Sequence, residues 1–506
     1  MTVIGLDFGN TRSFTSFVQG NDPVTRLGGV CRDLLPEQQV LGGGIPSVFF
    51  YSKRHGELVG ADALKARPAA NCCRLLKRHL NESFSVDGVT FQYDDAIKKV
   101  AEYCLRMAMK ELRDQYHLTT RNVSLAYPVC YNPEQRRHLV ELISSITIDG
   151  EPIRVTGTIT EPAAAALDYL AEHGGAAQET TVLAFDLGGG TFDLSVVTVY
   201  PNGKQRGNGE NYYYDLKCQN GKELGGEEFD RKLREIMIGK MGEQPVGAVA
   251  DMLPKAVESA KLYLSDHESV EPDLMDRDGN YYDFTVTQAE FEQAARELVE
   301  QMVEMTGDTL REHPQVSLIL LTGGASQMPM IRKALEEAFP RYKDTIIFHR
   351  PSRAISYGAA RYGAHEDSVQ QRTIRDLGIA LMKTDENNRR FIRVMIPAGT
   401  GIPCACRTEG GFPEGASHAV TSVYEARVLN PDIHSIEKDF RFLMTAELDC
   451  GGRDLHNRKI DNLLSIDKYN LLTVKARSRE YPDIESTCHM QYDHLEAVER
   501  GDGEHG

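Results

Sequence analysis

The chain has 506 residues, with 57 Lys and Arg against 74 Asp and Glu, and a formal net charge of −17. At about 150 residues per domain this length predicts two or three domains, and an apolar content of 41% is typical of folded chains rather than disordered ones. Because the sequence has neither a basic stripe nor an apolar run of about 18–20 residues, we expect neither a nucleic acid nor a membrane as partner.

The start of the chain and its cysteines bear on where the protein resides. The first residues, MTVIGLDFG, lack the basic region and apolar stretch of a signal peptide. The ten cysteines show neither the C-x-x-C spacing of redox proteins nor the paired spacing of a zinc site. We therefore expect a cytoplasmic protein with reduced thiols.

A weak internal repeat organises the first part of the chain. Residues 3–11 (VIGLDFGNT) and 182–191 (VLAFDLGGGT) both contain an apolar run, an Asp, one apolar residue, a glycine and a threonine shortly after. Strand-like runs follow at 13–18 and 191–199. The repeat predicts two β-hairpins with Asp-x-Gly turns, in two similar lobes that face a shared cleft.

Strands and helices alternate between and after these hairpins. The spacing of apolar residues predicts helices over 94–116, 133–145, 163–172, 225–240, 249–265, 288–313 and 329–339. Further strands are predicted over 122–128, 155–160 and 317–322. This alternation is typical of an α/β domain.

The composition changes near residue 365. A polar stretch without periodicity is followed by short strands and turn clusters, which predict an all-β domain of roughly 120 residues. We therefore expect an α/β domain over 1–365, a polar linker over 366–375, an all-β domain over 376–498 and a disordered tail over 499–506.

The glycine turns and the two repeated aspartates predict a site for phosphates and a metal. Glycines at 188–190 let the backbone approach an anion and expose consecutive N–H groups, and the threonine hydroxyl adds a donor. A third glycine turn, at 323–325, joins a buried strand to a helix whose N-terminus would face the ligand. Asp7 and Asp186 would face each other across the cleft and flank a divalent cation, held largely through water if it is Mg²⁺.

Together these motifs resemble the heat-shock protein 70 (DnaK-type) family of the actin-like ATPase superfamily. The family's two phosphate loops are similar to VIGLDFGNT and LAFDLGGGTFDLSVV in this chain. A connecting segment of the family is similar to VTGTITEPAAAALDYL, and its adenosine loop is similar to LILLTGGASQMPMIRKAL. GKELGGEEFD and RAISYGAARYGA also match, and the matches run in family order over residues 3–364. The resemblance implies a two-lobed, duplicated ribonuclease-H-like ATPase domain followed by a β-sandwich. Beyond residue 373 the resemblance is weaker and rests on segments such as DLGIAL and LLTVKAR.

The resemblance also implies ATP or ADP and Mg²⁺ as cofactors, with K⁺ as the additional cation typical of the family. Asp7 and Asp186 would hold the metal, and Lys77 would orient the attacking water. The other implied catalytic residues are Glu161, Asp193 and Thr191. The implied nucleotide-binding residues are Gly9, Asn10, Thr11, Arg12, Gly188, Gly189, Gly190, Thr191, Glu258, Lys261, Ser265, Gly323, Gly324, Ala325 and Gln327. Pro128 and Arg136 match the family's proposed relay between its domains.

Several positions depart from the family pattern. Leu262 and Gln327 stand where two arginines usually enclose the adenine, so cation–π stacking is lost and we expect weaker nucleotide binding. Asn10 replaces a threonine, Cys130 an aromatic residue and Ser352 an aspartate.

The linker and the end of the chain depart further. Residues 366–372 (EDSVQQR) contain a single apolar residue, where the family has a leucine-rich docking linker. About 1.5–3 kcal/mol of burial per leucine is therefore missing, which predicts weak coupling between the domains. No helical segment follows the β region in this sequence, so we expect no lid and fast dissociation of captured peptide.

The sequence is compatible with three functions. The leading one is an ATP-dependent chaperone that hydrolyses ATP to regulate binding of unfolded or extended polypeptides on a lidless sandwich, with co-chaperones as further partners. The second is a nucleotide-gated interaction module that binds ATP with little hydrolysis and recognises a dedicated protein partner. The third is an actin-like filament or a sugar kinase on the same fold.

Overall fold

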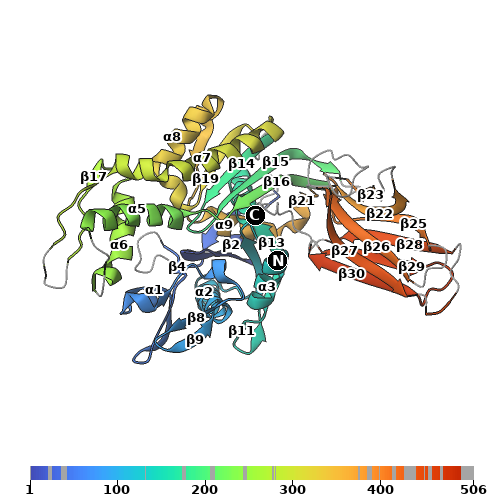
Figure 1. Ribbon diagram of the computed structural model, residues 1–506, viewed down its shortest axis with the longest axis horizontal. Coiled ribbons are helices and arrows are strands. Elements are labelled where there is room, and N and C mark those ends of the chain that lie inside the picture. The colour runs from blue at the N-terminus through green and yellow to red at the C-terminus, as the bar shows by residue number, and fades with distance from the viewer. Residues whose placement is uncertain are drawn as a thin grey trace, which may run out of the picture. The chain divides into compact units, whose positions relative to one another are not determined.

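The computed structural model describes most of the chain and divides it into two compact units (Figure 1). The described residues are 2–20, 26–35, 43–131, 133–173, 178–205, 211–242, 245, 248–275, 279, 281–373, 376–384, 390–397, 399–412, 418–426, 440–449, 451–453, 458–467 and 471–491. The first unit comprises residues 1–131, 138–204 and 218–369, and the second 132–137, 205–217 and 370–506. The tail expected at 499–506 lies outside the described residues.

The first predicted hairpin is confirmed at the centre of a mixed sheet. Strands β1 (Ile4–Phe8) and β2 (Arg12–Gln19) pair antiparallel, and β10 (Asn122–Tyr127) runs parallel to β1 on its other side. With β13 (Arg154–Thr160) and β3 (Val30–Asp33) the strand order is β13-β10-β1-β2-β3. The hairpin turn therefore lies in the middle of the sheet, where neighbouring elements can surround it.

The second hairpin repeats this arrangement in another sheet. Strands β14 (Thr180–Leu187) and β15 (Phe192–Gln205) pair antiparallel, and β19 (Leu318–Thr322) runs parallel to β14, with β20 (Ile346–Phe348) beyond it. Asp186 occupies the second-last position of its strand, as Asp7 does in β1. The duplication read from the two motifs is thus confirmed in the backbone.

The predicted helices form close to their expected bounds. They are α2 (Tyr93–Tyr116), α3 (Pro133–Ser144), α4 (Glu161–His173), α5 (Gly226–Met241), α6 (Ala248–Tyr263), α7 (Gln288–Glu312) and α8 (Pro329–Ala338), joined by α1 (Gly60–Lys65) and α9 (Ala354–Ala364). Figure 1 shows α5, α6, α7 and α8 gathered beside the sheet that carries β14 and β19. Each lobe has its own apolar core, one built around α2 and the other around α5 to α8.

Small residues let α4 and α9 approach each other and β1. A Cβ on Gly358 would lie 1.8 Å from the carbonyl oxygen of Ala164, and one on Gly5 would lie 2.2 Å from that of Ser356. Glycine is therefore required at these two positions, and the alanines of α4 and the glycines and alanines of α9 keep the other contacts between these backbones short.

Further strands, most of them short, complete the first unit and include several that the periodicity did not predict. They are β4 (Ile45–Pro46), β5 (Phe49–Ser52), β6 (Gly56–Val59), β7 (Cys72–Cys73), β8 (Ser83–Val86), β9 (Val89–Gln92), β11 (Thr147–Ile148), β12 (Glu151–Pro152), β16 (Asn211–Lys222, which begins in the second unit), β17 (Ser269–Val270) and β18 (Val286–Thr287). Most have two to four residues, too few for a period of two to stand out.

The second unit is a β-sandwich, as the resemblance implied. One sheet has the order β23-β22-β26-β27 and the other β25-β28-β29-β30, with antiparallel neighbours throughout. The strands are β22 (Leu377–Thr384), β23 (Arg390–Ile396), β25 (Cys404–Gly411), β26 (His418–Ala426), β27 (Phe440–Asp449), β28 (Lys459–Ile466), β29 (Leu471–Ser478) and β30 (Glu485–Gln491). Alternate residues of both sheets, including Val423 and Val474, form one buried core.

The stretch expected to be a linker without periodicity has regular structure. It contains a 3₁₀ helix (Glu366–Ser368) and strand β21 (Val369–Arg372), which pairs antiparallel with β24 (Gly401–Ile402). The Arg372 guanidinium donates to Asp215 Oδ1 at 2.6 Å and to the Tyr212 hydroxyl at 2.7 Å. Polar side chains thus find polar partners here, which a search for apolar periodicity does not detect.

Candidate functional site

The turns of the two hairpins lie in contact with each other. A Cβ on Gly189 would lie 2.1 Å from Oγ1 of Thr11, and one on Gly190 would lie 2.4 Å from Nδ2 of Asn10. A Cβ on Gly225, just before α5, would lie 2.6 Å from the amide nitrogen of Gly190. The glycines therefore allow two loops from different lobes to close around one small volume.

The N-terminus of α5 holds the second loop. The N–H groups of Gly226 and Glu227 donate to the carbonyl oxygens of Gly188 and Gly189, both at 2.9 Å. Among the described residues, the N–H groups of Gly189 and Gly190 donate no hydrogen bond. The carbonyls are thus directed toward α5, and two adjacent N–H donors are left for an anion.

Four buried carboxylates and one buried lysine lie beside these loops. Asp7, Asp186, Asp193 and Glu161 are all less than 8% exposed, and Lys77 is 1% exposed. Lys77 Nζ donates to Glu161 Oε1 at 2.5 Å. A lysine that sequence alone marks as an ordinary surface residue is therefore the buried counter-charge of this cluster.

Burial and mutual repulsion disfavour the charged forms of the aspartates. Burial, reinforced by the charge of Glu161, raises the pKa of Asp7 to about 8, although Lys77 acts in the opposite direction. Burial and then Glu161 likewise raise the pKa values of Asp186 and Asp193 well above the ordinary range. The cluster carries more negative charge than Lys77 can balance.

A divalent cation fits this cluster. Asp186 Oδ1 and Asp193 Oδ2 are buried and have no hydrogen-bond partner among the described residues. Such oxygens are costly to bury unless a cation or water satisfies them. Hard oxygen ligands with excess negative charge are what Mg²⁺ prefers.

The third glycine turn borders the same cluster. Gly323 has φ +80°, and a Cβ there would lie 2.5 Å from Asp186 Oδ1. The 3₁₀ helix that follows (Gly324–Gln327) leaves Gly324 and Gln327 exposed. The structure therefore brings the turns at 9–12, 188–191 and 323–325 together, although they are far apart in sequence.

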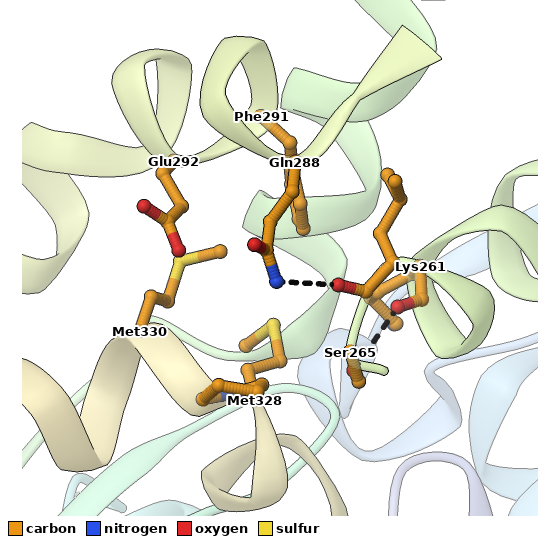
Figure 2. Close-up of a pocket in the computed structure, with 9 residues that line it drawn as sticks. Lys261, Ser265, Gln288, Phe291, Glu292, Met328 and Met330 are labelled. Carbon is orange, nitrogen blue, oxygen red and sulfur yellow. Dashed lines mark hydrogen bonds between the residues drawn. The ribbon is translucent and has the colours of Figure 1, made fainter. Parts of the chain in front are cut away.

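A pocket lies between α6, α7 and the start of α8 (Figure 2). It is open to solvent, has a cavity volume of only about 10 Å³, and is lined by Lys261, Leu264, Ser265, Gln288, Phe291, Glu292, Met328, Pro329 and Met330. Lys261 Nζ pairs with Asp230 at 2.6 Å, and Ser265 donates its hydroxyl to the Lys261 carbonyl at 3.2 Å. Of the three expected adenosine residues on α6 and just after it, Glu258 is exposed and does not line this pocket.

Arg78 is a site residue that the sequence did not reveal. Its Nη1 and Nη2 donate to the two carboxylate oxygens of Glu228 at 2.9 and 3.0 Å, and its Nε donates to the Gly190 carbonyl at 3.0 Å. Glu228 in turn accepts from the Gly225 N–H at 2.6 Å. The residue ties the 3₁₀ helix that carries Lys77 (Leu76–His79) to the second loop and to α5. Its position next to Lys77 was the only signal available.

The remaining expected residues occupy defined places. Arg12 donates to the Gly43 carbonyl at 2.9 Å, and burial lowers its pKa, while the charge of Glu258 opposes this. Pro128 is buried directly after β10, and Arg136 is buried on α3. The role of Pro128 and Arg136 as a relay stays a prediction.

Substitution of Gly189 tests the contact between the loops. We expect Gly189→Ala to weaken nucleotide binding by about tenfold or more, because its Cβ would overlap Thr11. Gly239→Ala on α5 is the matched control, because no atom lies within 4 Å of its added Cβ. Calorimetric titration with Mg·ADP compares the two, and equal affinities would contradict the close contact.

Comparison with known proteins agrees with the fold. The two sheets with equivalent hairpins and the apposed glycine turns define a two-lobed fold of the actin-like ATPase type. The family model described as Hsp70 protein matches residues 104–377. The chain belongs to the Hsp70 family.

A curated relative supports this assignment. The chain is 28% identical over 404 residues to heat shock protein hsp-6 of Caenorhabditis elegans, an alignment that covers 72% of this chain and 57% of that protein. The chain thus spans less than two thirds of the length of the relative it matches. Among the described residues, no helix is both long and apolar enough to cross a membrane.

Proposed function

We propose that this protein binds ATP with Mg²⁺ between its three glycine turns and hydrolyses it to regulate the binding of polypeptide to the β-sandwich, as a chaperone of the Hsp70 type. The observation that carries the proposal is the buried ion pair of Lys77 and Glu161, set among three aspartates. An ion pair so buried is weak evidence for stability, because its desolvation offsets most of the attraction. A catalytic role explains its presence better.

The phosphates would lie against the glycine loops. The free N–H groups of Gly189 and Gly190 and the hydroxyls of Thr11 and Thr191 would donate to the phosphate oxygens. Asp7 and Asp186 would hold Mg²⁺ through its water shell, and the bound ion would neutralise phosphate charge. K⁺, which the resemblance also suggests, stays a prediction.

Lys77 would position the attacking water and stabilise charge on the γ-phosphate. Its ammonium is held in place by Glu161 at 2.5 Å, and its backbone carbonyl accepts from the Tyr131 hydroxyl at 2.6 Å. Asp193, held by the Val129 N–H at 3.1 Å, keeps one oxygen free to accept a proton from the water. Phosphoryl transfer needs mainly such positioning and charge neutralisation.

The adenine side would bind weakly because it lacks guanidinium groups. Leu262 is 59% exposed and Gln327 is also exposed, so neither encloses a base with a cation. We expect Leu262→Arg to tighten Mg·ADP binding about threefold to tenfold through cation–π stacking. Leu118→Arg, at another exposed leucine, is the control, and calorimetry measures both. An unchanged affinity for Leu262→Arg would contradict this account of the adenine side.

Polypeptide would bind across β26 and β27 of the sandwich, which carry exposed apolar side chains. Val420 is 56% exposed and Phe442 57% exposed, and the Phe442 ring meets that of Tyr424 edge to face at 5.7 Å. Exposed aromatic and β-branched side chains on neighbouring strands are suited to apolar segments of an extended chain.

A charge on this surface tests its role in polypeptide binding. We expect Val420→Asp to weaken binding of an unfolded polypeptide at least tenfold, because a carboxylate must be desolvated on contact. Thr487→Asp, at an exposed position of β30 in the other sheet, controls for added charge. Fluorescence anisotropy of a labelled peptide measures the affinity of both variants. If Val420→Asp binds the peptide as tightly as wild type, the peptide binds elsewhere.

One observation favours the second function, a nucleotide-gated module with a dedicated protein partner. Residues 366–372 contain Val369 as their only apolar residue, which leaves little to couple the domains by apolar burial. Steady-state ATP hydrolysis with and without a permanently unfolded polypeptide separates the two. Stimulated turnover supports the chaperone, and turnover indifferent to polypeptide supports the module. Co-chaperones and a cytoplasmic location belong to the chaperone proposal.

A further inference from the structure

A cluster of two histidines and a glutamate lies at the end of α4 and just after β20. His173 and Glu172 come from α4, and His349 follows β20. One potential ligand atom from each of these residues lies within 4.8 Å of the other two. Among the described residues, this is the only group of three or more such side chains so close together.

Hydrogen bonds orient both imidazoles and fix their tautomers. His349 donates from Nε2 to Asp168 Oδ2 at 2.8 Å, and Asp168 is fully buried. His173 donates from Nδ1 to the Tyr169 carbonyl at 3.0 Å. Because these partners accept, the proton lies on the bonded nitrogen and the other nitrogen of each ring carries a lone pair. Nδ1 of His349 and Nε2 of His173 have no partner among the described residues.

The surroundings hold these side chains in place. The His173 ring stacks on Tyr169 at 4.5 Å, and the His349 ring meets Tyr169 edge to face at 5.4 Å. Glu172 Oε1 accepts from Arg350 at 2.5 Å, which leaves Oε2 without a partner among the described residues. Each of the three residues thus uses one polar atom for orientation and keeps one for a ligand.

We propose that His173, His349 and Glu172 bind a divalent transition metal of the zinc type. Imidazole selects such ions over Mg²⁺, and two histidines with one carboxylate leave a fourth position open for water. A buried carboxylate behind a ligating histidine, as Asp168 lies behind His349, is the usual second layer of such sites. Arg350 and Arg361 balance the charges of Asp168 and Glu172, so we expect micromolar rather than tighter affinity.

The test is zinc binding to the full chain, freed of metal by a chelator and measured in excess Mg²⁺. Wild type is expected to bind one zinc ion. His173→Gln is expected to bind zinc with an affinity about tenfold or more weaker. His267→Gln is a matched control, because His267 Nδ1 also bonds a carbonyl four residues earlier, that of Tyr263, and its ring stacks on that tyrosine. Both replaced histidines are exposed, so folding is preserved.

Two further readouts decide the outcome without nucleotide turnover. Zinc should raise the melting temperature of wild type and His267→Gln but not of His173→Gln, because a ligand that binds only the folded state stabilises it. Co²⁺ as a probe should show no thiolate charge-transfer absorption. Equal zinc affinity for His173→Gln and wild type, no zinc binding at all, or thiolate absorption would each overturn the proposal.

Discussion

Replacing Lys77 with methionine is expected to lower the rate of ATP hydrolysis about 100- to 1,000-fold, the usual cost of losing one charge-stabilising donor. Methionine keeps most of the length and the apolar stem of the side chain but removes the ammonium that contacts Glu161. Nucleotide affinity should change much less, because the glycine loops and the metal ligands remain. Phosphate release under saturating ATP, with calorimetry for affinity, measures both quantities.

Stability has to be separated from catalysis in this variant. Removing Lys77 leaves Glu161 buried without its counter-charge, which costs about 3–5 kcal/mol of folding free energy. The double variant Lys77→Met/Glu161→Gln should recover much of that stability while turnover stays low. Lys110→Ala, at a lysine 65% exposed on α2, should change neither quantity. Full turnover in the double variant would show that the ion pair has no catalytic role.

Replacing Asp186 with asparagine is expected to change stability and nucleotide binding in opposite directions. Burial raises the pKa of Asp186 in the folded state well above its unfolded value, as it raises the pKa of Asp7 to about 8. The folded, metal-free protein therefore holds protons that the unfolded chain releases. The contribution of such a group to stability is complete below about pH 4 and is lost as pH rises through the folded pKa, by about 1.4 kcal/mol per pH unit.

The metal-free wild type should accordingly lose stability between pH 6 and pH 8. Asp186→Asn should flatten this dependence and be more stable than wild type at pH 8 in chelator, because asparagine carries no charge to bury. With Mg·ADP the order should reverse, since the variant has lost a metal ligand. Asp62→Asn, at an exposed position of α1, is the control. Urea unfolding at each pH would contradict the account if Asp186→Asn were less stable than wild type in chelator.

The sequence was sufficient for features that depend on local patterns. The strand–Asp-x-Gly–strand motif predicted both hairpins and placed Asp7 and Asp186 at equivalent positions, because strand and turn are decided within about ten residues. The long helices α2 and α7 were predicted within one residue for the same reason. The all-β character of the second unit followed from short strands separated by turn clusters, whereas its sandwich form was implied by the family resemblance.

Features that depend on distant contacts were not accessible in this way. Lys77 is buried because its 3₁₀ helix packs beside Glu161, 84 positions later in the chain, and nothing in its neighbourhood indicates this. Arg78 meets Glu228 at a separation of 150 residues. The histidine cluster likewise joins α4 to a residue after β20. Such pairings depend on the tertiary fold, so local sequence patterns do not predict them.

The most direct test of the central claim is a single-turnover assay in which excess protein is mixed with γ-labelled ATP and Mg²⁺ and quenched over time. We predict that wild type releases the γ-phosphate of all bound ATP, that chelation of Mg²⁺ prevents this, and that Lys77→Met retains intact ATP. If wild type binds ATP but leaves it intact, or does not bind it, the carboxylate cluster between the glycine turns is not a hydrolytic site.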